Sequence, residues 1–335
     1  MPVAVMEQRR TARWTIALAA ACLLLAACGA DERSAVPPPL RVGIDLWPGF
    51  FPIAIAQQQG LLAQRGVEVE VHLASDTDAL SGEFAAGNHD IIGVALGDAI
   101  TLSRIQPDVV VLLVTDESTG GDVVMRRQGF VDDGRSPLRI GTNIGGFGEL
   151  FLQTYVERAG LNPARMVWSD IDAWQVPQAL RDGSLDFAHT WQPYTITALA
   201  DGATTVFTSA ETPGLIPSVY LTTRAVMETR EAELRLMTEA WFEASAWWRN
   251  NPDSGNAIAA AALKLDPKSV SLQGVRPYTQ ADNRAAMTGG PAAPLAKLID
   301  QYSTFFVERG SLSTPPQATR MLHPELFEPT AVKAE

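Results

Sequence analysis

Aromatic and acidic side chains gather in the loops that follow the predicted β-strands, and they are the residues best suited to binding chemistry. The aromatic members are Trp47, Phe50, Phe51, Phe147, Trp191 and Tyr194. The acidic members are Asp45, Asp98, Asp116, Glu117, Asp122, Glu149 and Glu211, and these loops contain no Lys or Arg. Carboxylates and aromatic faces attract cations and nitrogen-rich rings, whereas anion sites usually recruit Arg or Lys. The loops therefore favour a neutral or cationic nitrogen-containing ligand.

Several of these residues also have a purely structural interpretation. Asp98 and Asp122 are typical of helix caps or turns, and Asp116 is compatible with a solvated position. The glycine-rich segment 145–148 opens a predicted helix, where free backbone N–H groups can donate to a ligand. A tight turn alone would use the same glycines, so both interpretations stay open.

Catalytic signatures are absent from the sequence. The four histidines His72, His89, His189 and His323 do not pair at metal-binding spacing. There is no Gly-x-Ser-x-Gly nucleophile elbow, and no phosphate-binding Gly-x-x-x-x-Gly-Lys segment. We therefore predict a binding protein without metal or cofactor, and not an enzyme.

Length, charge and cysteine content exclude further classes of protein. The chain has 335 residues, enough for about two domain-sized units, and 46% of them are hydrophobic. Its formal net charge of −12 argues against a nucleic-acid partner, which needs a basic surface. Two cysteines cannot form a disulfide scaffold.

The N-terminus has the pattern of an export signal. Three arginines precede an uncharged stretch from residue 15 to residue 27. This stretch is shorter than the roughly 20 residues that span a bilayer, which disfavours the alternative of a transmembrane anchor. The segment Leu25-Ala26-Ala27-Cys28-Gly29 resembles a bacterial lipoprotein box, with Cys28 as the lipidated residue. We predict a signal peptide at 1–27 and a lipidated, proline-rich tether at 28–39.

Beyond residue 39 the chain alternates short apolar strands with helices, and its pattern repeats. The segment 41–45 (RVGID) is echoed by 139–143 (RIGTN), and 87–90 (GNHD) by 183–186 (GSLD). The offsets are 98 and 96 residues, and Gly60 and Gly160 are likewise 100 residues apart. Alternating strands and helices indicate an α/β fold with helices on both faces of each sheet. The repeat indicates two similar lobes.

Six segments of these loops carry a resemblance to a known family. They are 47–52 (WPGFFP), 97–99 (GDA), 118–122 (STGGD), 145–148 (GGFG), 190–194 (TWQPY) and 213–216 (PGLI). Together they resemble bacterial ABC-importer substrate-binding proteins of the nitrate/sulfonate/taurine type, whose members also include binders of thiamine-pyrimidine-like compounds. The family often has Glu where this chain has Gln192, and a lost carboxylate weakens the argument for a cation at that position.

The resemblance implies a two-lobed α/β fold of the type II periplasmic-binding-protein class, with a mixed sheet in each lobe and two crossover strands. The first lobe would comprise residues 40–115 and 216–335, and the second residues 116–215. Ligand contacts are expected from Asp45, Trp47, Phe50, Phe51, Asp98, Asp116, Asp122, Gly146, Phe147, Trp191, Gln192 and Tyr194. Trp47 and Trp191 would stack on the ligand. Asp98, Asp116 and Asp122 would accept hydrogen bonds from it, and the amides of 145–148 would donate them.

The functional expectation is an extracytoplasmic solute-binding lipoprotein of an ABC importer. Its partners would be a small-molecule ligand, a permease and an ATPase in the inner membrane, and the membrane itself through the lipid anchor. It would be a monomer on the periplasmic side, or on the outer face of a single membrane. Alternatives are nitrate, sulfonate or taurine binding, a ligand sensor for a membrane signalling partner, and a thiamine-pyrimidine synthase-like enzyme. The last is disfavoured because that class uses a cysteine-rich motif.

Overall fold

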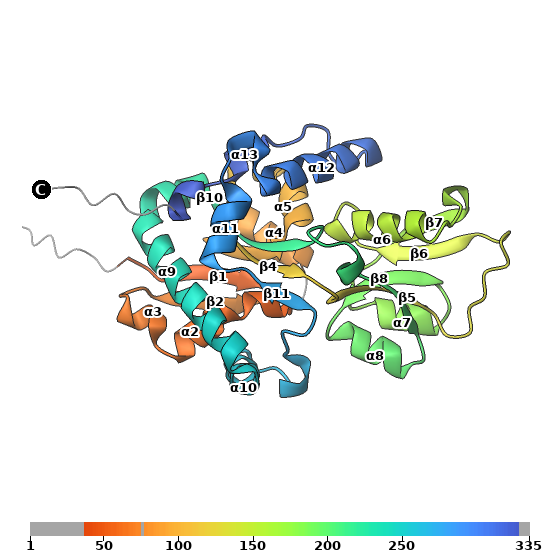
Figure 1. Cartoon of the computed structure of the whole chain (residues 1–335), viewed down its shortest axis with the longest axis horizontal. Coiled ribbons are helices and arrows are strands. Elements are labelled where there is room, and N and C mark those ends of the chain that lie inside the picture. Colours follow the sequence, from red (N-terminus) through yellow and green to blue (C-terminus); the bar gives the residue numbers. More distant parts are fainter. Residues whose placement is uncertain (1–36, 75–76, 328–335) are drawn as a thin grey trace, which may run out of the picture. The chain divides into compact units, whose positions relative to one another are not determined.

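Two mixed β-sheets form the framework in the computed structural model, which describes residues 37–74 and 77–327 (Figure 1). The first sheet has the strand order β11-β4-β10-β3-β1-β2, and the second the order β7-β6-β8-β5-β9. The first comprises β1 (Leu40–Ile44), β2 (Val69–Leu73), β3 (Ile91–Ala95), β4 (Val109–Ser118), β10 (Pro217–Thr223) and β11 (Val275–Pro277). The second comprises β5 (Asp122–Arg126), β6 (Leu138–Thr142), β7 (Met166–Asp170), β8 (Phe187–Trp191) and β9 (Thr204–Thr208).

Helices flank both sheets, as the alternating sequence pattern predicted. Those associated with the first sheet are α2 (Pro52–Gln58), α3 (Leu61–Gln64), α4 (Thr77–Ala85), α5 (Leu96–Leu102), α9 (Arg224–Asn250), α10 (Pro252–Leu263), α11 (Gln280–Met287), α12 (Pro294–Arg309) and α13 (Ala318–Met321). Those associated with the second are α6 (Phe147–Arg158), α7 (Val176–Arg181) and α8 (Tyr194–Ala200). We refer below to each sheet with its helices as the first and second lobe.

Two connections join the lobes. The chain leaves the first sheet between β4 and β5, at residues 119–121, and returns between β9 and β10, at residues 209–216. The two connections bond to each other, because the hydroxyls of Ser118 and Ser209 lie 2.7 Å apart and the Gly120 N–H donates to Ser209. A third segment braces them, since Thr119 and Gly121 both donate backbone N–H groups to the carbonyl of Gly274.

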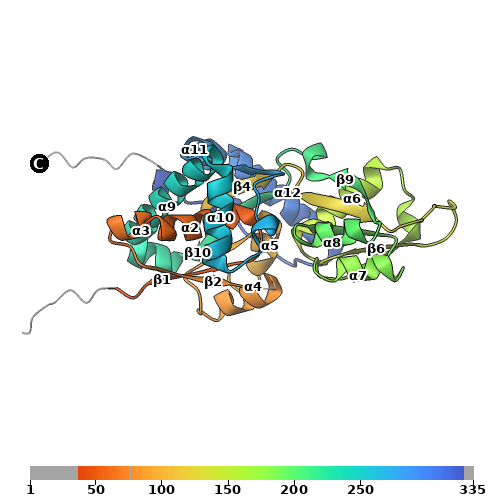
Figure 2. The ribbon, with the colours of Figure 1, turned by 90° about the horizontal axis from the view of Figure 1, so that it is seen from below.

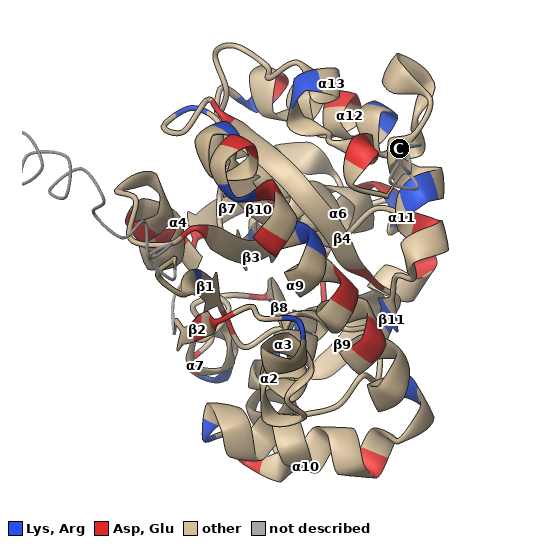
Figure 3. Ribbon diagram, turned by 90° about the vertical axis from the view of Figure 1, so that its left-hand side faces the viewer, with Lys and Arg blue, Asp and Glu red and all other residues tan. Residues whose placement is uncertain are grey.

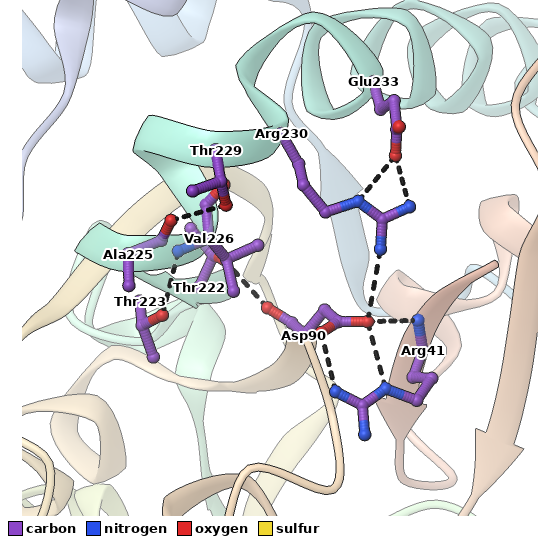
Figure 4. Close-up of polar contacts among 9 residues, drawn as sticks. All are labelled: Arg41, Asp90, Thr222, Thr223, Ala225, Val226, Thr229, Arg230 and Glu233. Atoms are coloured by element: carbon purple, nitrogen blue, oxygen red, sulfur yellow. Dashed lines mark hydrogen bonds and ion pairs between the residues drawn. The ribbon is translucent and has the colours of Figure 1, made fainter. Parts of the chain in front are cut away.

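The sequence repeat corresponds to a matching clasp in each lobe. Arg41 donates its backbone N–H and two side-chain N–H groups to the carboxylate of Asp90, at 2.8 to 3.1 Å (Figure 4). Arg139 makes the same three hydrogen bonds to Asp186, at 2.7 to 3.1 Å. The clasp ties β1 to the start of β3 in the first lobe and β6 to the start of β8 in the second, and each of these strand pairs is parallel.

Asp90 has a further role in joining the first sheet to α9. Its backbone carbonyl accepts a hydrogen bond from the Thr222 hydroxyl, and its carboxylate lies 3.7 Å from the guanidinium of Arg230 (Figure 4). Arg230 has non-helical backbone angles, so α9 is kinked there, and its side chain also pairs with Glu233. The clasp therefore fixes both the sheet and the helix that covers it.

The larger hydrophobic core lies in the first lobe. Helices α9 and α10 pack on α2 over the sheet, which Figure 2 shows from below. Trp241 and Trp248 are fully buried there. In the second lobe Phe151 and its neighbours pack between α6 and the sheet. Charged residues of both signs are interspersed along the outer helices (Figure 3).

The predicted signal peptide, Cys28 and most of the predicted tether lie outside the described residues. Cys22 lies there as well, so neither cysteine belongs to the part of the chain that the structure describes. Among the helices of that part, none combines the length and the apolar character needed to cross a membrane.

Candidate functional site

A cavity of about 430 Å³ is lined by loops and helix ends from both lobes. The first lobe contributes the end of β1, the helix α4 and both ends of α5. The second contributes the loop between β6 and α6, the loop after β7, the end of β8 and the start of α8. The walls are thus built mainly from the carboxyl ends of strands, where ligands of open α/β sheets bind.

The structure brings half of the predicted site residues to this cavity. Those in its wall are Asp45, Asp98, Gly146, Phe147, Trp191 and Tyr194. Those outside its wall are Trp47, Phe50, Phe51, Asp116, Asp122 and Gln192.

Trp47 and Asp116 are paired with each other behind the cavity. The indole N–H of Trp47 donates to Asp116 Oδ1 at 2.9 Å, and the Thr115 hydroxyl donates to Oδ2 at 2.7 Å. Asp116 is fully buried and Trp47 nearly so. Trp47, which was expected to stack on a ligand, therefore does not line the cavity. The indole instead packs on the connection at Gly121, which has no side chain to obstruct the ring.

Phe50 and Phe51 belong to the core of the first lobe. Both are at most 2% exposed, and the ring of Phe50 stacks on Tyr220 with a centroid distance of 5.8 Å. The sequence placed them near the site because they follow β1, but the short helix at 48–50 turns both rings into the core. Gln192 lies between Trp191 and Tyr194 without lining the cavity.

Asp122 lies behind the cavity wall and contacts His189, which is part of the wall. Its Oδ1 lies 2.9 Å from His189 Nε2, and both side chains are 2% exposed. His189 lines the cavity, and its Nδ1 lies 3.3 Å from the hydroxyl of Thr142. Asp122 thus orients an imidazole in the wall, and the helix cap and turn interpretations of this residue do not apply.

Two aspartates in the wall have pKa values above the ordinary range. Burial raises the pKa of Asp98 to about 7 and that of Asp45 to about 6. Neighbouring carboxylates add to both shifts, including that of Asp122. A cation in the cavity would reverse this repulsion and favour the ionised forms.

Further wall residues were missed by sequence reasoning. Asp170 ends β7, a strand that the sequence pattern did not single out, and Asp172 follows it; Trp174, two residues further on, is 53% exposed. Asp78 lies on α4, away from any strand end. Arg104 lies just beyond α5, and donates to the carbonyl of Ser311 at 2.9 Å. The absence of basic residues therefore holds for the predicted loops but not for the whole wall.

In the glycine-rich loop, two of the four amides of 145–148 that were expected to donate to a ligand are bonded to carboxylates of this chain. The N–H of Phe147 donates to Asp98, that of Gly145 to Glu149 and that of Ile144 to Asp170, at 2.9 to 3.0 Å. The positive end of α6 is thus occupied by carboxylates of this chain. The loop combines a tight turn, with Gly145 at φ 83°, and a built-in acidic cap.

The family model for NMT1-like proteins matches residues 34–264, which is more than half of the chain. The chain belongs to the NMT1-like family. A search of curated protein sequences gave no match.

Solved structures with the same fold agree with the family assignment. The aliphatic sulphonate binding protein SsuA of Escherichia coli has a TM-score of 0.71 and 16% identity, over 89% of this chain and 95% of that chain. A ligand-binding component of an ABC-type import system from Staphylococcus aureus, solved with zinc bound, has a TM-score of 0.72 and 11% identity, over 87% and 98%. The predicted two-lobed, type II periplasmic-binding-protein fold is confirmed for this NMT1-like protein.

The same fold also carries an enzyme. The desulfurization enzyme DszB has a TM-score of 0.63 and 15% identity, over 87% of this chain and 98% of that chain. The fold therefore does not decide between binding and catalysis, whereas the residues of the cavity wall bear on this choice.

Proposed function

We propose that this protein is the solute-binding component of an ABC importer, and that it takes a small neutral or cationic nitrogen-containing organic solute. The observation that carries the proposal is the charge of the cavity wall. Its described part contains five carboxylates, Asp45, Asp78, Asp98, Asp170 and Asp172, against one guanidinium, that of Arg104.

Aromatic groups complement this charge. Phe147, Trp174, Trp191 and Tyr194 all line the cavity, and the rings of Phe147 and Trp191 lie 5.9 Å apart. Aromatic faces attract protonated amines and stack on nitrogen heterocycles. A cavity of about 430 Å³ is of the size that holds a small organic molecule.

An anionic solute, such as the aliphatic sulphonate after which SsuA is named, fits this wall less well. An anion at the start of α6 would have to displace Asp98 from the N–H of Phe147. It would also meet the other four carboxylates. Arg104 is the one feature of the wall that favours an anion, and it is already bonded to Ser311.

The test is direct binding of a ligand panel to the purified protein. Intrinsic tryptophan fluorescence and calorimetry would be recorded with alkylamines, aminopyrimidines, taurine, an alkanesulfonate and nitrate. We expect saturable binding of an amine or pyrimidine. Tight binding of taurine or nitrate without any response to amines or pyrimidines would refute the charge argument. Formation of a new product from a bound ligand would show an enzyme, the role that DszB has on this fold.

We further propose that the protein is exported and lipid-anchored at Cys28, and that it works as a monomer beside a permease and its ATPase. This rests on the lipoprotein-like sequence around Cys28. Metabolic labelling with a fatty acid should mark the wild-type chain and leave Cys28→Ser unmarked. Equal labelling of both chains would exclude anchoring at this cysteine.

A further inference from the structure

Three metal-ligating side chains lie together on the first lobe, outside the wall of the cavity. His72 comes from the edge strand β2, Glu83 from α4, and His89 from the turn before β3. Glu83 Oε2 lies 2.9 Å from Nε2 of His89 and 3.9 Å from Nε2 of His72. One ligand atom from each residue lies within 4.8 Å of the other two.

These distances are close to those of a zinc site. Zn²⁺ binds imidazole nitrogen and carboxylate oxygen at about 2.0–2.2 Å, so neighbouring ligand atoms of a tetrahedral site lie about 3.3 Å apart. His72 and Glu83 have side chains 55% and 44% exposed, which leaves them free to close the remaining difference, at most about 1.5 Å. Their exposure also leaves a fourth position open to water.

The two imidazoles are held in place by the sheet beneath them. The rings of His72 and His89 stack with a centroid distance of 5.3 Å, and His72 pairs with Gly43 across the strands β1 and β2. A Cβ at Gly43 would lie 3.1 Å from the ring of His89, so the glycine makes room for it. His72 therefore stands on a strand and Glu83 on a helix, and His89 packs against the sheet from the turn before β3.

The second lobe shows that the fold does not require these residue types. At the repeat offset of 96 residues, Leu185 corresponds to His89 and Ala179 to Glu83. Ser169 pairs with Gly141 in the position that His72 takes opposite Gly43. An apolar or small residue thus serves at each of these places when only packing is needed.

His89 is costly as a purely structural choice. It is 9% exposed, and its Nδ1 has no hydrogen-bond partner in the described structure. An unpaired buried polar atom costs roughly 1–3 kcal/mol, a cost that leucine avoids at the matching position. The other ring nitrogen, Nε2, lies 2.9 Å from Glu83, and this is the atom that histidine supplies and leucine cannot.

We propose that His72, Glu83 and His89 form a binding site for a divalent transition metal of the zinc class, and that the metal fastens α4 to the first sheet. The same helix supplies Thr77, Asp78 and Ser81 to the wall of the cavity. Thr77 donates to Asp45, a carboxylate of that wall, at 3.3 Å. A metal at Glu83 therefore restrains the helix that shapes one side of the solute site.

The test is Zn²⁺ binding to the full-length chain after removal of metal with a chelator, measured by calorimetry. The comparison is the triple variant His72→Ser, Glu83→Ala, His89→Leu, which installs the residues of the second lobe and is expected to fold. It keeps Cys22, Cys28 and every cavity aspartate, so a difference in binding reports on this cluster alone. We expect the wild type to bind one more equivalent of Zn²⁺ than the variant, with no such difference for Mg²⁺.

Two further measurements separate the site from its effect on α4. The single variant His72→Ser, at an exposed position, should weaken Zn²⁺ binding by at least about tenfold while leaving the unfolding midpoint of the metal-free protein unchanged. Amide hydrogen exchange over residues 77–85 should slow when Zn²⁺ is added to the wild type, and not in the triple variant. Equal stoichiometry and affinity in wild type and triple variant would overturn the site. Zn²⁺ binding without slower exchange would overturn the coupling to α4.

Discussion

The backbone N–H of Phe147 donates a 3.0 Å hydrogen bond to Oδ1 of Asp98, and thereby joins the first residue of α6 to the first turn of α5. The two residues belong to different lobes and both line the cavity. A carboxylate of the first lobe thus caps a helix of the second. The bond orients Asp98 in the wall of the cavity.

Ionisation of Asp98 and Asp45 predicts how stability depends on pH. Their folded-state pKa values of about 7 and about 6 lie above the ordinary value of 3.8. Between about pH 4 and pH 7 the folded state binds more protons than the unfolded state, so these two groups lower the free energy of unfolding as pH rises. Asp98→Asn removes one of them, and should lose less stability between pH 5 and pH 8 than the wild type, as measured by urea denaturation. Parallel stability curves for the two proteins would contradict the shift at Asp98.

The same groups predict the pH dependence of solute binding. A cation favours the ionised carboxylates, so its affinity should rise between pH 5 and pH 8, by at most about tenfold per pH unit for each group. An anion would show the opposite slope. Titration calorimetry with the best ligand of the panel at several pH values gives the slope, and Asp98→Asn should flatten it. A falling affinity for a cation would be inconsistent with this assignment.

Substitutions of Trp191 and Trp47 should have different effects, the first on solute affinity and the second on stability. Trp191 lines the cavity, whereas Trp47 is buried and donates to Asp116. Trp191→Ala should weaken solute binding by about three- to thirtyfold, the range expected for one stacking or cation–π contact. Trp47→Phe should leave affinity nearly unchanged but cost about 1–3 kcal/mol of stability, because Asp116 loses a buried donor. Equal loss of affinity in both variants would mean that Trp47 also contacts the solute.

Gly148 should be intolerant of any side chain. A Cβ there would lie 2.3 Å from Nδ1 of His189 and 2.4 Å from Oγ1 of Thr142, both buried in the second lobe. Gly148→Ala should therefore lower the melting temperature and weaken solute binding together. Gly82→Ala is the matched control, since Gly82 is also a helix residue in the cavity wall but has no atom within 4 Å of its Cβ position. It should stabilise α4 by up to about 1 kcal/mol.

The paired clasps predict similar costs in the two lobes. Burial acts to raise the pKa of Asp90 and that of Asp186, but hydrogen bonds from arginine outweigh it and hold both pKa values below the ordinary range. Their contribution is therefore present at neutral pH and lost as pH falls. Asp90→Asn and Asp186→Asn should each cost about 1–3 kcal/mol in denaturant unfolding at pH 7. Asp300→Asn, at an exposed position on α12, should change stability by less than about 0.5 kcal/mol.

The course of the chain could be predicted because its signals are local. Apolar runs of strand length, such as 91–96 and 109–114, became β3 and β4, and the repeated RVGID and GNHD segments became matching strands and turns. The Arg–Asp clasp gives the repeat a physical meaning, since it needs an Arg at the start of one strand and an Asp just before the start of its parallel neighbour. What the sequence could not show was that these positions bond to each other.

The site was only partly predictable, because a position at the carboxyl end of a strand does not determine which way the side chain points. Asp98 and Trp191 face the cavity, whereas Asp116 and Asp122 face the interior, where they hold Trp47 and His189. Carboxylates at similar loop positions thus differ in role through the neighbours that packing gives them.

By itself, the sequence determined the α/β class, the internal repeat, the strand-end loops and the predominance of carboxylates among their charged groups. These follow from residue order, because backbone periodicity and turn residues act over a few positions. Only the tertiary structure decided which carboxylates reach the cavity, that Asp170 and Arg104 join them, and that Asp98 caps α6. It also brought together His72, Glu83 and His89, whose spacing in the chain matches no metal motif. Such contacts arise when packing joins distant segments, and the order of residues along the chain does not encode them locally.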